Sequence, residues 1–313
     1  MRILFWGTPE FATPPLRALL GEGHEVVGVV TQPDRPQGRS RSTLVPSPVK
    51  QVALEEGIPI LQPDRPRGDE FLAQLRALEP ELSVVVAYGH LLREEVIALP
   101  PRGTLNIHAS LLPRWRGAAP IQAALLAGDA ETGVTIMQMV RALDAGPMLL
   151  TLTTPIAPGE TGGELTERLS ELGAEAIVEA VTLLELGELT ATPQDDAAST
   201  YAPKIDRTSA RLDWTRPAAE VARAIQAYDP KPGAWGVVRE AEIRCFGARH
   251  LPDRRGDAGE VLEVGEMGMV IACGSGAVAI ESVHPAGRRR LAALDWGQGR
   301  GIAVGDRWAL LDT

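Results

Sequence analysis

Short runs of residues that are apolar on both faces recur near the start of the chain and alternate with helical patterns. The runs cover residues 2–7, 26–30 and 84–89, and the helical patterns cover about 12–21, 48–56 and 69–78. A strand with two apolar faces must be covered on both sides, as the parallel strands of α/β proteins are. We therefore expect an α/β domain with a parallel sheet between layers of helices.

The chain of 313 residues is longer than most single domains, so we expect two domains. Residues 190–206 are polar and contain two prolines, which is typical of a linker. Short alternating strands are predicted near 235–250, 259–264, 268–273 and 277–283, and this spacing is typical of a small β-barrel such as an OB-like barrel. The predicted domains are therefore residues 1–189 and 207–313, joined by the linker.

Several classes of function lack their signature in this sequence. The apolar run at the N-terminus is too short for a signal peptide, and no run reaches membrane-spanning length. Cys245 and Cys273 fit neither a disulfide framework nor a metal site, and the five histidines are scattered. The sequence also has no dinucleotide-binding fingerprint, GxSxG elbow or phosphate loop. We expect a cytoplasmic protein with no metal and no membrane partner.

Residues 105–117 combine a predicted strand with an unusual set of polar side chains. Strand alternation places Asn106, His108 and Ser110 on one face and apolar residues on the other. Pro113 then ends the strand, because proline has no N–H to donate to a ladder. The simplest alternative is that these residues only cap a sheet edge.

A carboxylate is expected near the same place. Asp144 lies in the loop that follows a strand predicted over residues 133–139, and ligands of open α/β sheets bind outside the carboxyl ends of the strands. A carboxylate beside an imidazole fixes its tautomer, and an asparagine amide donates to an oxyanion. Asn106, His108 and Asp144 together predict acyl transfer to an amine without a covalent nucleophile.

A long basic connection lies inside the acidic part of the chain. The net charge is −10: residues 1–204 hold 16 Lys and Arg against 26 Asp and Glu, whereas residues 205–313 hold 15 of each. The connection over 32–48 nevertheless contains Arg35, Arg39 and Arg41. Long loops tend to be functional, so we predict a phosphate-contacting loop; the alternative is a solvated, flexible connection.

The sequence resembles the formyltransferases that use 10-formyltetrahydrofolate, and among them most closely the methionyl-tRNA formyltransferases. The resemblance runs almost end to end, and its most specific segments are residues 5–11, 31–39, 46–50, 106–122, 128–139 and 144–146. It implies a Rossmann-like catalytic domain, a C-terminal OB-like domain that holds RNA, and a monomer. The implied reaction moves a formyl group from 10-formyltetrahydrofolate to the α-amine of methionine on initiator tRNA.

The resemblance also implies roles for particular residues. Asn106 would bind the formyl oxygen, His108 would be the general acid and base, and Asp144 would orient His108 or relay its proton. Tetrahydrofolate would contact two segments, the turn Ser110, Leu111, Leu112 and Pro113 and the segment Ala87, Tyr88 and Gly89, although the latter also reads as an ordinary core strand. Arg39 and Arg41 would contact the acceptor arm of the tRNA.

The chain departs from the family pattern in the loop over 139–147. The family usually has an acidic residue after Met139, glycine in place of Ala142 and an acidic residue in place of Pro147.

Three alternatives to the implied function stay open: formylation of glycinamide ribonucleotide or a sugar-nucleotide amine, hydrolysis of the folate to formate, and tRNA binding without catalysis. The basic loop and the C-terminal domain argue against the first, and the set of three site residues argues against the last.

Overall fold

The computed structural model describes residues 1–37 and 43–311, which form two compact units. The first unit comprises Met1–Gly117, Thr132–Thr154 and Thr166–Ala202, and the second comprises Ala118–Glu131, Pro155–Leu165 and Pro203–Thr313. Residues 190–202 of the predicted linker thus have their contacts within the first unit. The domain boundaries given above stay predictions.

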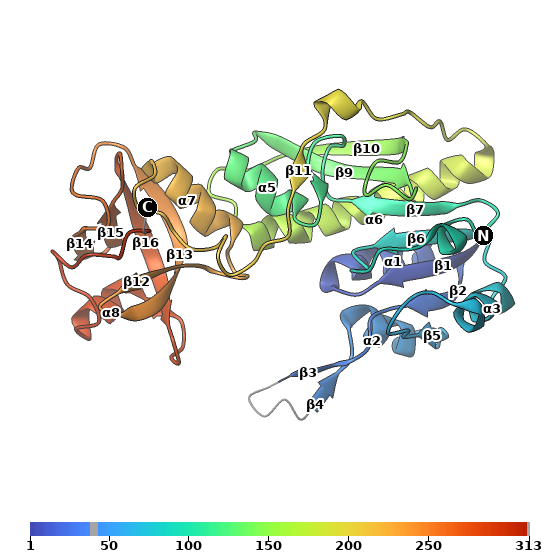
Figure 1. Ribbon diagram of the computed structural model, residues 1–313, viewed down its shortest axis with the longest axis horizontal. Helices are drawn as coiled ribbons and strands as arrows, with labels where there is room; N and C mark the ends of the chain where they lie inside the picture. Colours follow the sequence, from blue (N-terminus) through green and yellow to red (C-terminus); the bar gives the residue numbers. More distant parts are fainter. Residues whose placement is uncertain (38–42, 312–313) are drawn as a thin grey trace. The chain divides into compact units, whose positions relative to one another are not determined.

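A seven-stranded sheet forms the centre of the first unit (Figure 1). Its order is β10-β9-β7-β6-β1-β2-β5, and β5, β2, β1, β6 and β7 run parallel to one another. The strands are β1 (Arg2–Gly7), β2 (Glu25–Val30), β5 (Ile60–Leu61), β6 (Leu82–Val86), β7 (Thr104–His108), β9 (Glu131–Gln138) and β10 (Met148–Pro155). The predicted α/β sheet is confirmed, except that β9 runs antiparallel to β7. Apolar patterning reports burial and not strand direction, so the sequence did not reveal this reversal.

Helices cover both faces of this sheet, as its apolar strands require. On one face, Trp6 and Val85 pack in a buried cluster with side chains of α3 (Asp69–Ala77) and α4 (Glu94–Ile97). On the other face, α6 (Gly162–Leu186) approaches β7 so closely that a Cβ on Gly173 would lie 3.1 Å from Cγ2 of Ile107. The remaining helices here are η1 (Glu10–Ala12), α1 (Thr13–Gly21), α2 (Pro48–Glu55) and η2 (Asp196–Ala198).

The described part of the basic connection is a short antiparallel pair, β3 (Arg35–Gln37) and β4 (Thr43–Val45). Its base is held by a polar cluster, in which Lys50 Nζ lies 2.6 Å from Asp34 Oδ2 and 2.8 Å from Gln62 Oε1. Asp34 also accepts a hydrogen bond of 2.8 Å from Gln62 Nε2, and its hydrogen bonds from Lys50 and Gln62 lower the pKa of its carboxyl group. Arg39 and Arg41, the predicted tRNA contacts, lie outside the described residues.

The second unit contains an antiparallel sheet of short strands with the order β12-β13-β16-β15-β14, and β17 pairs with β16. Single bridges join Trp308 to Val238, at the end of β12, and Arg307 to Glu260, just before β14. The strands are β12 (Ala234–Val238), β13 (Ala241–Leu251), β14 (Val261–Gly265), β15 (Gly268–Ala272), β16 (Ala277–Pro285) and β17 (Leu291–Ala292); the helices are α5 (Pro120–Ala127), α7 (Ala218–Ala227) and α8 (Ala293–Gln298). The predicted short strands are confirmed, and their closure into an OB-like barrel stays a prediction.

A local signal in the sequence marks the beginning of α6 correctly. The capping-box pattern predicts a helix over 161–187, and α6 spans Gly162–Leu186. The Thr161 N–H donates to Glu164 Oε2 at 2.9 Å, and the Glu164 N–H donates to Thr161 Oγ1 at 3.2 Å, which is the reciprocal pair that defines this motif.

No helix within residues 1–37 and 43–311 has both the length and the apolar character needed to cross a membrane.

The buried thiols of the second unit give a prediction about reactivity and alkaline stability. Burial raises the pKa of the Cys273 thiol to about 12, and it also raises the pKa of Cys245. Both thiols should therefore resist a thiol-specific chromogenic reagent at pH 8 and react stoichiometrically once the protein is unfolded. Unfolded thiols ionise near pH 9, so the free energy of unfolding should decrease as the pH rises above about 9.

A Cys273→Ala variant is the control, because one thiol should then react after unfolding. Rapid labelling of two thiols in the folded protein at pH 8 would contradict the burial of this core.

Candidate functional site

Two predicted site residues lie on one face of β7, an interior strand of the first unit's sheet between β9 and β6. Asn106 and His108 alternate with Leu105 and Ile107, and Ile107 faces α6. Asn106 and His108 therefore point away from α6, and both are largely buried, with 9% and 6% of their surface exposed. Strand geometry fixes the spacing of this amide and this imidazole.

Asp144 reaches the same face from a loop and not from the carboxyl end of a parallel strand. Because β9 is antiparallel to β7, its last residue, Gln138, lies opposite Leu105 at the beginning of β7. The loop over 139–147 then turns back across the face of β7 and brings Asp144 Oδ2 to 3.8 Å from His108 Nδ1. The loop thus brings Asp144 to His108, the last residue of β7, although β9 itself runs antiparallel to β7.

The backbone of this loop is tightly constrained. Asp144 has φ +48°, in the left-handed region that aspartate tolerates better than most residues. A Cβ on Gly146 would lie 1.7 Å from the carbonyl oxygen of Gln138, so only glycine fits there without a shift of the backbone. Asp144 Oδ2 also accepts a hydrogen bond of 2.9 Å from the Gly117 N–H, which holds the carboxylate toward His108.

The hydrogen bonds of His108 indicate its tautomer. His108 Nε2 lies 2.9 Å from the carbonyl oxygen of Trp115. A carbonyl oxygen only accepts, so Nε2 carries a hydrogen and donates it. In the neutral imidazole, the lone pair is then on Nδ1, the atom that faces Asp144. His108 is thus arranged to accept a proton at Nδ1 and to form an ion pair with Asp144 once it has done so.

The side-chain amide of Asn106 is available as a donor. Among residues 1–37 and 43–311, no group forms a hydrogen bond with this amide. A largely buried amide without a protein partner is costly unless water or a ligand satisfies it. Its place on the same face as His108 suits a hydrogen bond to the oxygen of a bound carbonyl group.

The turn after β7 is built by its own hydrogen bonds. Ser110 is fully buried, and its hydroxyl donates to the Arg114 carbonyl at 2.6 Å. The Thr135 hydroxyl donates to the Ser110 carbonyl at 2.7 Å and accepts from the Leu112 N–H at 3.2 Å. Of the predicted folate-contacting residues, Leu111 packs beside Gly133 and Leu112 is buried, whereas Pro113 is half-buried. Ser110 and Leu112 therefore shape the turn from inside.

The second predicted folate segment follows β6 at the edge where β1 and β6 end. Ala87 and Gly89 are exposed and have positive φ angles of +47° and +89°. The carbonyl oxygen of Tyr88 accepts from Thr8 Oγ1 at 3.1 Å and from Gln32 Nε2 at 3.0 Å. The Tyr88 ring itself is buried, and burial raises the pKa of its hydroxyl to about 12. This segment can therefore contact a ligand through its backbone groups but not through a titratable side chain.

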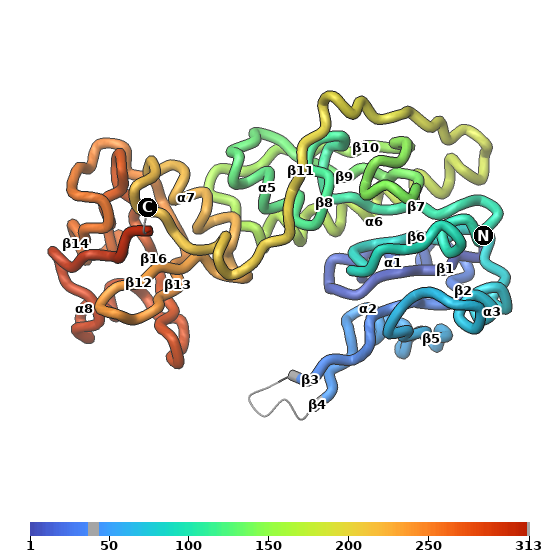
Figure 2. Tube along the Cα trace, viewed as in Figure 1, coloured from blue at the N-terminus to red at the C-terminus, as the bar shows by residue number. Residues whose placement is uncertain are grey.

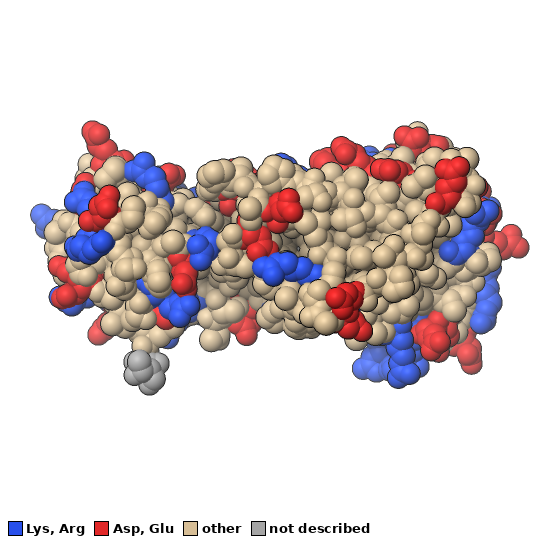
Figure 3. Space-filling model, turned by 90° about the horizontal axis from the view of Figure 1, so that it is seen from above, with Lys and Arg blue, Asp and Glu red and all other residues tan. Residues whose placement is uncertain are grey.

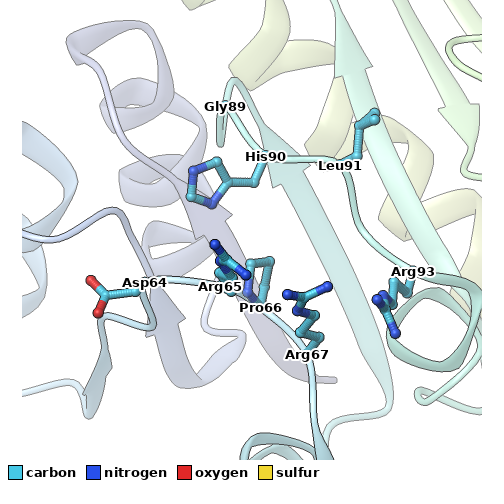
Figure 4. Close-up of a pocket in the computed structure, with 8 residues that line it drawn as sticks. All are labelled: Asp64, Arg65, Pro66, Arg67, Gly89, His90, Leu91 and Arg93. Carbon is cyan, nitrogen blue, oxygen red and sulfur yellow. The ribbon is translucent and has the colours of Figure 1, made fainter.

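A basic pocket of about 550 Å³ lies beside this segment. Arg65 and Arg67 line it from the chain after β5, and Gly89, His90 and Arg93 line it from the chain after β6. Figure 4 shows Arg65 and Arg67 facing His90 and Arg93. The carboxylate of Asp64 is turned away from the arginine side chains (Figure 4). The pocket suits a ligand group with negative charge.

Sequence reasoning missed this pocket, although the sequence contained a signal. The run Gln-Pro-Asp-Arg-Pro-Arg-Gly at 62–68 repeats the run at 32–38 at all positions except one. The two runs follow the neighbouring strands β5 and β2, and Gln62 Nε2 donates to the Gln32 carbonyl at 3.0 Å. The roles of Trp115 and Gly117 were also missed. Both residues act through backbone groups, which every residue type has, so the residue type does not reveal them.

Comparisons with known proteins show which families this chain resembles. Residues 1–181 match the family model described as formyl transferase, and residues 204–301 match the one described as formyl transferase, C-terminal domain. The methionyl-tRNA formyltransferase of Pseudomonas paraeruginosa is 49% identical over 94% of this chain and 94% of its own length. That of Aromatoleum aromaticum is 48% identical over 98% and 97%, respectively.

Solved structures with lower sequence identity share the fold. HypX from Aquifex aeolicus, solved in complex with tetrahydrofolic acid, aligns with a TM-score of 0.67 at 22% identity over 95% of this chain. This chain spans only 47% of the length of HypX. WlaRD, a sugar 3N-formyl transferase solved with dTDP and 5-N-formyl-tetrahydrofolate, aligns with a TM-score of 0.67 at 16% identity over 92% of this chain and 99% of its own.

Proposed function

The chain belongs to the formyl transferase family, and we propose that it moves a formyl group from 10-formyltetrahydrofolate to the α-amine of methionine on initiator tRNA. The observation that contributes most is the convergence of an unpartnered amide, an imidazole and a carboxylate on one face of β7. The named relatives, nearly half identical over almost the whole chain, support the choice of substrate.

In the proposed mechanism, Asn106 binds the formyl oxygen. Attack by the amine turns the formyl carbon tetrahedral and places negative charge on its oxygen. The free N–H groups of Asn106 donate to that oxygen, and removal of one such donor typically costs about 3 kcal/mol of the activation barrier. Because the amide has no hydrogen-bond partner among the described residues, it can donate to the formyl oxygen without first losing a hydrogen bond to one of them.

In this mechanism His108 accepts and donates a proton, and Asp144 stabilises the protonated imidazole. The attacking amine loses a proton to His108 Nδ1, whose lone pair is available because Nε2 donates to the Trp115 carbonyl. The imidazolium then faces the Asp144 carboxylate at 3.8 Å, which stabilises its charge. His108 returns the proton to N10 of the folate as the C–N bond breaks, and N-formylmethionyl-tRNA and tetrahydrofolate result.

The folate is proposed to lie between the two segments predicted for it. The turn from Ser110 to Pro113 forms one wall, shaped from inside by Ser110 and Leu112. Backbone groups of Ala87, Tyr88 and Gly89 face the pterin on the other side. The adjoining basic pocket suits the carboxylates of the glutamate tail, because Arg65, Arg67 and Arg93 present three guanidinium groups there.

The tRNA is proposed to contact the basic loop and the C-terminal unit. Acidic and basic side chains are interspersed on the face in Figure 3, and the described residues form no extended basic field there. We propose that the phosphate contacts come from local groups, for which Arg39 and Arg41 are our candidates. We also propose that the protein works as a cytoplasmic monomer, since charged tRNA and reduced folate are both cytoplasmic substrates.

The central prediction is that the protein formylates initiator tRNA and that substitution of His108 removes most of this activity. The purified protein should formylate charged initiator tRNA from 10-formyltetrahydrofolate and should act poorly on elongator methionyl-tRNA. His108→Ala should lower kcat by about 10²- to 10⁴-fold, because it removes the general base. Product should be measured by acid gel or by mass spectrometry of the released amino acid, and circular dichroism should show that the variant is folded.

Other outcomes would contradict this assignment. Formate release without tRNA would indicate a hydrolase, and formylation of a sugar-nucleotide amine in place of tRNA would indicate a different acceptor. Full activity of His108→Ala would rule out His108 as the base.

The basic pocket gives a prediction about the folate tail. Arg65→Ser combined with Arg67→Ser should raise KM for the folate about tenfold without changing KM for tRNA, because charged hydrogen bonds to carboxylates are lost. Arg76→Ser, on the exposed face of α3, is the control. A folate donor without glutamate carboxylates should not distinguish the pocket variant from the wild type; if it does, the pocket binds another part of the substrate.

The basic loop gives a prediction about tRNA. Arg39→Ala combined with Arg41→Ala should weaken tRNA binding and flatten its dependence on salt, since fewer counterions are released. Binding of the folate should stay unchanged. Affinity measured by filter binding at several salt concentrations tests this, and an unchanged slope would mean that the loop is only a solvated connection.

A further inference from the structure

Residues 192–202, most of the predicted linker, run along the site as a strap tied at both ends. At one end, Thr192 and Met148 exchange two backbone hydrogen bonds of 2.8 Å. At the other end, β11 (Tyr201–Ala202) pairs with β8 (Arg116–Gly117), and Figure 2 shows the two segments side by side. The strap belongs to the same compact unit as His108 and Asp144.

Gln194 of the strap holds the loop that carries Asp144. Its Nε2 donates to the carbonyl oxygens of Asp144 and Gly146, at 2.9 and 2.7 Å. Its Oε1 accepts from Arg116 Nε at 2.9 Å, which fixes the orientation of the amide. One side chain thus joins the Asp144 loop to the residue before Gly117, whose N–H binds the Asp144 carboxylate.

Thr200 of the strap holds the group that orients His108. Its hydroxyl oxygen accepts from the Trp115 N–H at 2.9 Å, and its carbonyl accepts from the Arg116 N–H at 2.9 Å. Trp115 has φ +62°, an uncommon conformation for a bulky residue that neighbouring contacts must maintain. The carbonyl of this same residue accepts the hydrogen of His108 Nε2.

We propose that Gln194 and Thr200 are positioning residues for the formyl transfer, acting through Asp144 and through Trp115 and His108, respectively. The proposal rests on the function given above. Neither side chain needs to touch a substrate. Their loss should shift the carboxylate and the imidazole relative to each other, and a misplacement of about 1 Å can cost on the order of 100-fold in rate.

Matched substitutions test the proposal. Gln194→Met keeps the size of the side chain and removes all three hydrogen bonds, and Thr200→Val removes the hydroxyl while Thr200→Ser retains it. We expect kcat to fall about 10- to 100-fold in the Met and Val variants, with KM for folate and tRNA within about twofold of wild type. Thr200→Ser should restore most of kcat. Gln226→Met is the control, because Gln226 of the second unit donates to the Ala248 carbonyl at 3.0 Å.

Hydrogen exchange separates this proposal from the proposed function. The Gly117 N–H should exchange faster in Gln194→Met than in wild type or in Gln226→Met, whether or not the protein is an enzyme. An inactive wild type with this exchange pattern would contradict the function and support the positioning. Unchanged kcat with a lowered melting temperature, or a raised KM with unchanged kcat, would overturn the positioning role. If Gln194→Met does not fold, Gln194→Glu keeps the acceptor for Arg116, removes both donors and is judged by the same criteria.

Discussion

The Asp144 carboxylate is the group on which the rest of the site depends. One of its oxygens accepts the Gly117 N–H at 2.9 Å and faces His108 Nδ1 at 3.8 Å. That single oxygen links the loop after β9, the turn after β7 and the imidazole on β7. Because the loop backbone is held in a left-handed conformation beside a glycine with no room for a side chain, the carboxylate has little freedom to move away.

The fold explains why such different segments meet at this oxygen. The face of β7 opposite α6 carries the polar side chains of Asn106 and His108, and the whole strand is buried. The antiparallel β9 directs its following loop back across that face, which a parallel neighbour would not do. The basic pocket adjoins the ends of β5 and β6, so that the proposed folate tail and formyl group would lie along one edge of the sheet.

Much of this was visible in the sequence, and what was not visible has a physical reason. Apolar runs and caps located β1, β2, β6 and α6, and strand alternation placed Asn106 and His108 on one face. Strand direction, the carbonyl of Trp115 and the N–H of Gly117 depend on tertiary folding, and residue types do not encode them. The polar segment after α6 has the composition of a linker, yet its side chains bind the Asp144 loop and the turn at Trp115. Arg39 and Arg41 stay predictions, since they lie outside the described residues.

The most direct measurement of the central claim is a single-turnover experiment on Asp144→Asn with a labelled formyl donor and charged initiator tRNA. The asparagine keeps an oxygen for the Gly117 N–H but removes the charge that faces His108. A role of the Asp144 charge in catalysis requires that the rate of formyl transfer falls by about 100-fold or more while both substrates bind as tightly as to wild type. A single-turnover rate equal to that of the wild type would contradict it.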